Sequence, residues 1–128
     1  MTSTVDILGV APYVRVTTYR RDGRGVPTAV WVVRDGDALA VWTATHTGKV
    51  KRVRRDGTVL VGPCDVRGRL TGPEVGGHAS ILDADGSERV RALLVRKYGL
   101  LGRLTVWGSR LRRGTAGTVG IRITINEG

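Results

Sequence analysis

Short runs of β-type residues, separated by glycine-containing turns, make up most of this sequence. Six such runs, rich in Val, Ile, Thr and Tyr, cover residues 13–20, 26–33, 38–43, 59–64, 69–82 and 118–125. Asp22-Gly23 and Asp35-Gly36 separate the first three runs, and such pairs are typical of tight hairpins. Helices do not alternate regularly with the runs, as a parallel sheet would require. The pattern predicts a mainly β fold, a small six-stranded antiparallel barrel whose first three strands form a meander.

Two of these runs carry further detail. Residues 69–82 contain Gly72-Pro73 and Gly76-Gly77, which predict a single long strand that is bent or bulged. In residues 118–125 the apolar side chains recur at every second position, which is typical of a strand with one buried face. They are Val119, Ile121, Ile123 and Ile125.

Two helices are predicted in the C-terminal half. Asp85 and Glu88 have the spacing of a capping box, and the apolar residues that follow recur at helical spacing as far as Tyr98, where Gly99 ends the helix. A second, basic and amphipathic helix is predicted over residues 100–112. Its apolar side would pack on the barrel or across a dimer, and the alternative is a helix at a membrane surface. That side consists of Leu101, Leu104, Trp107 and Leu111.

The length of 128 residues fits a single domain, residues 1–128. The apolar runs are only a few residues long, far short of the roughly 18 that span a bilayer, and the N-terminal residues do not resemble a secretory signal, so we expect a cytoplasmic protein. Cys64 is the only cysteine, and neither His46 nor His78 has a partner at zinc-ligand spacing. These features argue against a disulfide scaffold, a zinc finger or another metal site.

The charge balance predicts an anionic partner. The chain has 21 Lys and Arg against 11 Asp and Glu, a formal charge of +10. Residues 49–55 include five basic side chains, and Thr47 precedes them as a predicted helix cap. Amide groups at the start of such a helix, together with Lys49 and Lys51, would suit a phosphate group. The alternative is a solvated basic helix face.

Several short motifs occur in a recognisable order. They are residues 22–33 (DGRGVPTAVWVV), 35–37 (DGD), 41–43 (VWT), 48–52 (GKVKR), 54–56 (RRD), 62–68 (GPCDVRG) and 96–100 (RKYGL). In this order and spacing they resemble the split-barrel flavin and deazaflavin family related to pyridoxamine phosphate oxidase. The resemblance is greatest to the coenzyme F420-dependent oxidoreductases of actinobacteria.

The resemblance implies a six-stranded antiparallel split β-barrel with flanking helices, which forms a homodimer with cofactor grooves at the subunit interface. It also implies how the cofactor is bound. Thr28 and Val30 would lie along the ring, and Thr43 would support the ribityl or phosphate end. The phosphate would be held by Gly48, Lys49 and Lys51.

The activity implied by the resemblance is hydride transfer between coenzyme F420 and a small or planar organic substrate. The cofactor carries this chemistry, so the protein needs no catalytic acid or base. The coenzyme has a phosphodiester and an oligoglutamate tail, and the positive charges of Arg52, Arg54 and Arg55 would attract that tail.

Three alternatives remain open from the sequence. FMN shares the ring, ribityl chain and phosphate, so the same residues would suit it. A protein of this fold could also bind its cofactor without turnover. The third alternative, a basic nucleic-acid-binding protein, is less well supported because the chain has no Gln, a single Asn and few, dispersed aromatic residues.

Overall fold

The computed structural model describes residues 3–45, 47–113 and 118–126, and the side chains of these residues except 100–113. The helices are α1 (Thr4–Val10), α2 (Gly48–Arg55) and α3 (Ala84–Arg113). The strands are β1 (Tyr13–Tyr19), β2 (Gly25–Val30), β3 (Val32–Asp35), β4 (Ala38–Ala44), β5 (Thr58–Cys64), β6 (Val75–Ile81) and β7 (Thr118–Ile125).

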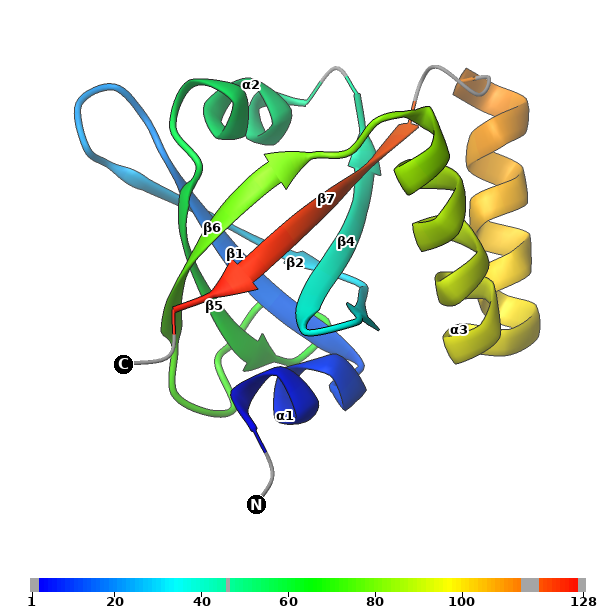
Figure 1. The fold of residues 1–128 in the computed structure, drawn as a ribbon, viewed down its shortest axis with the longest axis horizontal. Coiled ribbons are helices and arrows are strands. Elements are labelled where there is room, and N and C mark those ends of the chain that lie inside the picture. The colour runs from blue at the N-terminus through cyan, green and yellow to red at the C-terminus, as the bar shows by residue number, and fades with distance from the viewer. Residues whose placement is uncertain (1–2, 46, 114–117, 127–128) are drawn as a thin grey trace.

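All seven strands belong to one antiparallel sheet, in the order β2-β1-β5-β6-β7-β4-β3. The sheet is curled, with helices against its ends and one side (Figure 1). Its two edge strands, β2 and β3, follow each other in the chain and are separated only by Trp31. The chain therefore joins the two edges of the sheet, and the predicted mainly β barrel with flanking helices is confirmed.

Trp31 also accounts for the number of strands. Residues 26–33 were predicted to form one strand, but the structure divides them into β2, which pairs with β1, and β3, which pairs with β4. The described residues consequently form seven strands rather than six. The two antiparallel pairings of the predicted meander are present, but its continuous middle strand is not. The break between β2 and β3 at Trp31 thus lies where the pairing partner changes from β1 to β4.

The predicted long strand over residues 69–82 is also corrected. Only Val75–Ile81 form β6, and Leu70 adds an isolated bridge to Cys64. Pro73 has no N–H with which to extend the ladder, so regular pairing begins after it. Gly77 lies within β6, and position 77 requires glycine because a Cβ there would lie 2.8 Å from the carbonyl oxygen of Thr124. The strand predicted over residues 118–125 is confirmed as β7.

The inward face of the curled sheet holds the main hydrophobic core. Figure 1 shows α2 at one end of the barrel and α1 at the opposite end. Helix α1 was not predicted, although Ser3 and Asp6 form a capping box in which each side chain accepts a hydrogen bond from the other residue's backbone N–H at 3.1 Å. Buried core residues include Leu8, Val14, Val16, Leu39, Val41, Val50, Val61, Ile121 and Ile123.

Helix α3 has a break at Gly99, where φ is 62° and ψ is −137°. The predicted helix end at Gly99 and the predicted second helix are therefore confirmed. The apolar side predicted for the second helix consists of side chains that lie outside the described ones. The start of α3 differs from the prediction, because the Asp83 carboxylate, rather than that of Asp85, accepts the backbone N–H of Gly86 at 2.8 Å. Glu88 forms an ion pair with Arg91.

Within the described ranges, no helix combines the length and apolar character needed to cross a membrane.

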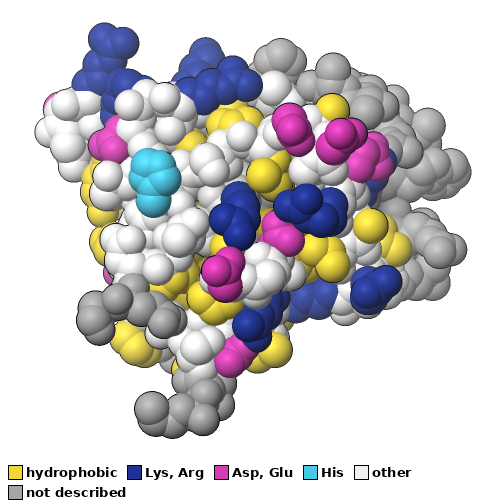
Figure 2. Space-filling model, in the orientation of Figure 1, with side chains coloured by type: hydrophobic (Ala, Val, Ile, Leu, Met, Phe, Trp, Pro, Cys, Tyr) yellow, Lys and Arg dark blue, Asp and Glu magenta, His cyan; other side chains and the backbone are white. Residues whose placement is uncertain are grey.

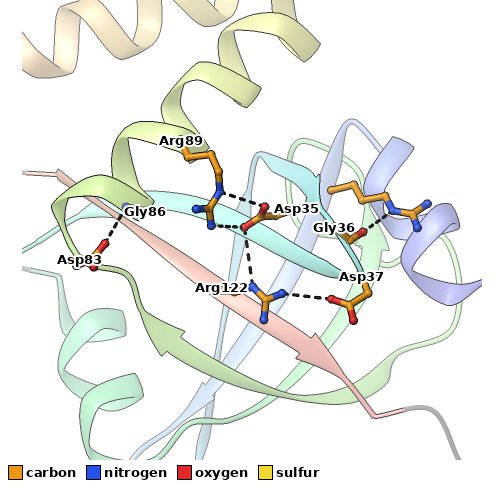
Figure 3. Close-up of polar contacts among 8 residues, drawn as sticks. Asp35, Gly36, Asp37, Asp83, Gly86, Arg89 and Arg122 are labelled. Carbon is orange, nitrogen blue, oxygen red and sulfur yellow. Dashed lines mark hydrogen bonds and ion pairs between the residues drawn. The ribbon is translucent and has the colours of Figure 1, made fainter.

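An ion-pair network attaches the start of α3 to the sheet (Figure 3). The Arg89 guanidinium donates to both carboxylate oxygens of Asp35, at 2.8 and 3.3 Å. Arg122 on β7 lies 3.9 Å from Asp35 and donates to Asp37 at 3.2 Å. Because Asp35 ends β3, the network fixes that end of the edge strand against α3 and β7.

Lys97 and Tyr98 attach the other end of this helical segment to the start of β3. The Lys97 ammonium donates to the carbonyl oxygens of Gly9 at 2.8 Å, Ala11 at 2.6 Å and Val32 at 2.7 Å. The Tyr98 ring stacks on Trp31, with centroids 4.2 Å apart and planes 7° from parallel. The first segment of α3 thus contacts β3 near both of its ends.

Burial gives Lys97 an unusual titration. It lowers the pKa of the ammonium from 10.5 to about 8 even though three carbonyls surround it. We expect a nitrogen-detected NMR titration of Lys97 to show a midpoint near this value. Between about pH 8 and pH 10.5 the unfolded chain then binds more protons than the folded chain, so the free energy of unfolding rises with pH relative to Lys97→Met. A midpoint at the ordinary lysine value would contradict this account.

Candidate functional site

Helix α2 begins as the sequence predicts. The Thr47 side chain accepts the backbone N–H of Val50 at 3.4 Å and donates to the carbonyl oxygen of Ala44 at 3.0 Å. Val50 and Val53 are buried in the barrel core, which fixes the rotation of the short helix. The N-terminal turn of α2 therefore lies at the end of the barrel, beside the end of β4. His46, which directly precedes Thr47 in the sequence, lies outside the described residues.

Lys49 is the most unusual residue of this helix. Its side chain turns into the barrel, where the residue is 7% exposed, and its ammonium donates to the Thr43 hydroxyl at 3.3 Å. An ammonium has three N–H donors, and the described part of the chain supplies only this one acceptor. The structure thus brings together two predicted site residues and leaves donor capacity unused at a buried cation.

The electrostatic surroundings of Lys49 are positive. Burial lowers the pKa of the Lys49 ammonium, and the nearby Arg52 charge lowers it further. No ion pair links Lys49 to a carboxylate among the described residues. A buried cation that lacks a counter-charge is costly, and an anion at this position would offset that cost.

Arg52 forms the second part of the site. Its Nε donates to the buried Thr18 hydroxyl at 2.7 Å, and its guanidinium extends back over Gly48. A Cβ on Gly48 would lie 2.7 Å from Arg52 Nη1, so this glycine leaves the space that the guanidinium occupies. Gly48 is exposed and lies beside Lys49 in the chain and beside the Arg52 guanidinium in space.

Lys51 does not join this group. It is exposed and lies about 200° around the helix from Lys49, because each residue advances by about 100°. The two lysines predicted to bind one phosphate therefore point in different directions. Any contribution of Lys51 to anion binding would act at longer range than that of Lys49.

Thr28 and Val30 lie on β2 and face the barrel interior. They pair with the buried residues Val16 and Val14, and Val30 packs against the core. The Thr28 hydroxyl donates to the carbonyl oxygen of Val16 at 3.4 Å, so its proton is used within the sheet. Because β2 and β4 are in contact, Thr28, Val30 and Thr43 line the same interior.

A basic surface extends from this site toward the β1–β2 hairpin. Burial, followed by the charges of Arg20 and Arg55, lowers the pKa of the Arg52 guanidinium. An open hollow of about 480 Å³ adjoins these residues. It is lined by Tyr19, Arg20, Arg21, Gly23, Arg55, Asp56 and Thr58. Figure 2 shows Lys and Arg side chains along this edge of the molecule, over α2 and the hairpin.

Cys64 has no part in this site. It is buried on β5, and burial together with the negative charge of Asp65 raises the pKa of its thiol. A thiol that stays protonated is a poor nucleophile, so Cys64 acts here as a small buried residue of the core.

The contacts of Arg52 were the main feature of the site that the sequence did not predict. The sequence placed Arg52 with a distant anionic tail, whereas the structure places its guanidinium directly over the first turn of α2. Glycine at position 48, four residues before an arginine on the same helix face, was the available sign of this arrangement.

Comparison with solved structures identifies the fold that carries this site. No protein-family model matches the chain, and no curated protein matches it. The structure is similar to that of an F420 reductase, with a TM-score of 0.69 and 21% identity over 99% of this chain and 97% of that chain.

Two further solved structures are similar to this chain. A candidate pyridoxamine 5'-phosphate oxidase from Listeria innocua has a TM-score of 0.66 and 19% identity, over 94% of this chain and 89% of that chain. The heme storage protein of Vibrio cholerae has a TM-score of 0.67 and 12% identity, over 100% of this chain and 93% of that chain. The chain therefore has the split-barrel fold of pyridoxamine 5'-phosphate oxidase-like proteins.

Proposed function

We propose that this protein binds a flavin-type cofactor and that the cofactor is coenzyme F420. The observation that carries the proposal is the buried Lys49 ammonium, which has one acceptor among the described residues and a second cation, Arg52, beside it. The residues fit an anionic group, because Lys49, Arg52 and the exposed amide end of α2 adjoin one another. Lys49, Gly48 and Arg52 would hold the phosphate, and Lys51 would add long-range attraction.

The basic surface favours coenzyme F420 over FMN. Arg20, Arg52 and Arg55 influence one another electrostatically, and Arg20 and Arg55 line the open hollow beside α2. FMN has no anionic group beyond its phosphate, whereas coenzyme F420 continues into an oligoglutamate tail. The tail would follow this surface, although each exposed pair would contribute at most about 1 kcal/mol.

The proposed activity is hydride transfer between reduced coenzyme F420 and a small or planar organic acceptor. The cofactor would supply the hydride chemistry. The protein residues would do different work: Lys49 and Arg52 would neutralise the anionic end, and the Thr43 hydroxyl would hold the Lys49 ammonium in place there. The ring end would lie along the β2 segment around Thr28 and Val30, whose own side chains face the core. The F420 reductase among the similar structures supports this proposal, while the heme storage protein shows that the fold also serves a binding protein.

We further propose that the protein acts as a homodimer, with the partner subunit completing each cofactor groove, as the sequence resemblance implies. Sedimentation equilibrium should give twice the mass of one chain, and cofactor binding should weaken on dilution below the dimer dissociation constant. A monomer that binds cofactor with full affinity would refute this part of the proposal.

Turnover tests the proposed activity. Reduced coenzyme F420 is mixed with the protein and a panel of acceptors that includes quinones, nitroaromatic compounds and unsaturated carbonyl compounds. We expect oxidation of the coenzyme with at least one acceptor, faster than in protein-free controls. Lys49→Met should raise the apparent KM for the coenzyme more than it lowers kcat, because Lys49 contacts the anionic end. Tight binding without oxidation across the panel would instead indicate a cofactor store.

A further inference from the structure

The buried Lys49 and the half-buried Lys97 use their ammonium groups in opposite ways. Lys49 uses one of its donors, but the Lys97 ammonium has three carbonyl acceptors, those of Gly9, Ala11 and Val32, all within 2.8 Å. Three donors with three acceptors leave Lys97 no capacity for a ligand. Its contacts tie together the end of α1, the start of β3 and α3.

Tyr98 makes contacts at the same place. Its hydroxyl donates to the carbonyl oxygen of Pro12 at 2.8 Å and accepts the backbone N–H of Val32 at 3.2 Å. Its ring stacks on Trp31. Two consecutive residues of α3 therefore hold this segment: Lys97 and Tyr98 make hydrogen bonds to the backbone of Val32, and the Tyr98 ring stacks on Trp31.

The position of Trp31 gives these contacts their importance. Trp31 is the single residue between β2 and β3, which are the two edges of the curled sheet. Strand β3 is held at its far end by the Arg89–Asp35 ion pair (Figure 3). Among the described strands, β2 pairs with β1 alone and its second edge carries no ladder, so its C-terminal end depends on the conformation at Trp31.

We infer that Lys97 and Tyr98 are positioning residues for the cofactor site. They fix the backbone around Trp31, and through it they set where Thr28 and Val30 of β2 lie relative to Thr43 of β4. Neither residue needs to touch the cofactor. The inferred effect on the cofactor rests on the proposed function, whereas the inferred effect on β2 does not.

Amide hydrogen exchange of the cofactor-free, full-length protein tests the effect on β2. Tyr98→Phe keeps the aromatic stacking and removes the hydroxyl contacts, and Lys97→Met removes the ammonium. Arg96→Met is the matched control, because Arg96 is exposed and adjacent. We expect exchange in Val26–Val30 and at Val32 to become at least about tenfold faster in both variants, with β7 unchanged and the control like wild type. Unchanged exchange, or equal acceleration in β7, would overturn the inference.

Titration of the same variants with coenzyme F420 tests the effect on the site. Selective loosening of β2 should accompany a several-fold weaker affinity, and the Arg96→Met control should bind as wild type does. Loosened β2 with unchanged affinity would refute the positioning role. If wild type itself fails to bind coenzyme F420, the proposed function is wrong, while the exchange experiment still decides whether Lys97 and Tyr98 fix β2. Tyr98→Phe keeps the test available if Lys97→Met does not fold.

Discussion

Lys49→Met should weaken the binding of coenzyme F420 by about 1.5 kcal/mol or more, which is roughly tenfold in Kd. The variant removes a charge-assisted hydrogen bond to the phosphate, and such bonds are about twice as strong as neutral ones. Folding should respond in the opposite sense. Lys49 is 7% exposed and has one acceptor among the described residues, so replacing it with an unbranched apolar side chain removes a costly buried charge. We expect the free energy of unfolding to be unchanged or higher.

Lys51→Met is the matched control for this variant. It removes the same charge from the same helix, but from the exposed face, and we expect the affinity to fall less than about twofold. Isothermal titration calorimetry and urea unfolding of the three proteins measure both quantities. Equal losses of affinity in the two variants would show that net charge, rather than a contact of Lys49, governs binding.

Leu94→Ala should cause a large loss of stability, about 3 kcal/mol, with a fall of roughly 10 °C in Tm. Leu94 is fully buried in a small core between α3 and the outer face of β3 and β4. Its truncation leaves a cavity that the surrounding side chains, fixed by the sheet on one side, can fill only in part. The other fully or nearly fully buried members of this small core are Val33, Ala40 and Val90.

Leu93 provides the comparison for Leu94. It is only half-buried at the edge of the same cluster, so Leu93→Ala should cost less than half as much. Thermal unfolding followed by circular dichroism gives both values. A larger loss from Leu93→Ala would mean that α3 presents a different face to the sheet.

The sequence predicted those elements whose causes are local. Thr47 caps α2 through a neighbour three residues away, Val50 and Val53 follow the helical period, and Gly99 adopts a positive φ. The alternation in residues 118–125 likewise predicted β7 with its bounds. Each of these features is decided by residues close together in the chain, so spacing is enough to find it.

Features that depend on distant residues were not predicted. The valine-rich run around Trp31 has the composition of one continuous strand, and its division follows from pairing with β1 on one side and β4 on the other. The Arg52–Thr18 hydrogen bond joins residues 34 positions apart, and the Lys97 contacts span up to 88. In the site, the resemblance assigned Thr43, Lys49 and Lys51 to the same end of the cofactor. Thr43 and Lys49 are in contact, but Lys51 is exposed on another face of the helix, because spacing alone did not show which lysine faces the barrel.

The most direct test of the account is a titration of the purified, cofactor-free protein with coenzyme F420 and with FMN, at physiological salt, followed by fluorescence. We expect micromolar or tighter binding of coenzyme F420, and FMN binding about tenfold weaker because it lacks the tail that the Arg20 and Arg55 surface would attract. Equal or tighter binding of FMN would contradict the choice of cofactor. Binding of neither would contradict the assignment of Lys49 and Arg52 as a cofactor-phosphate site.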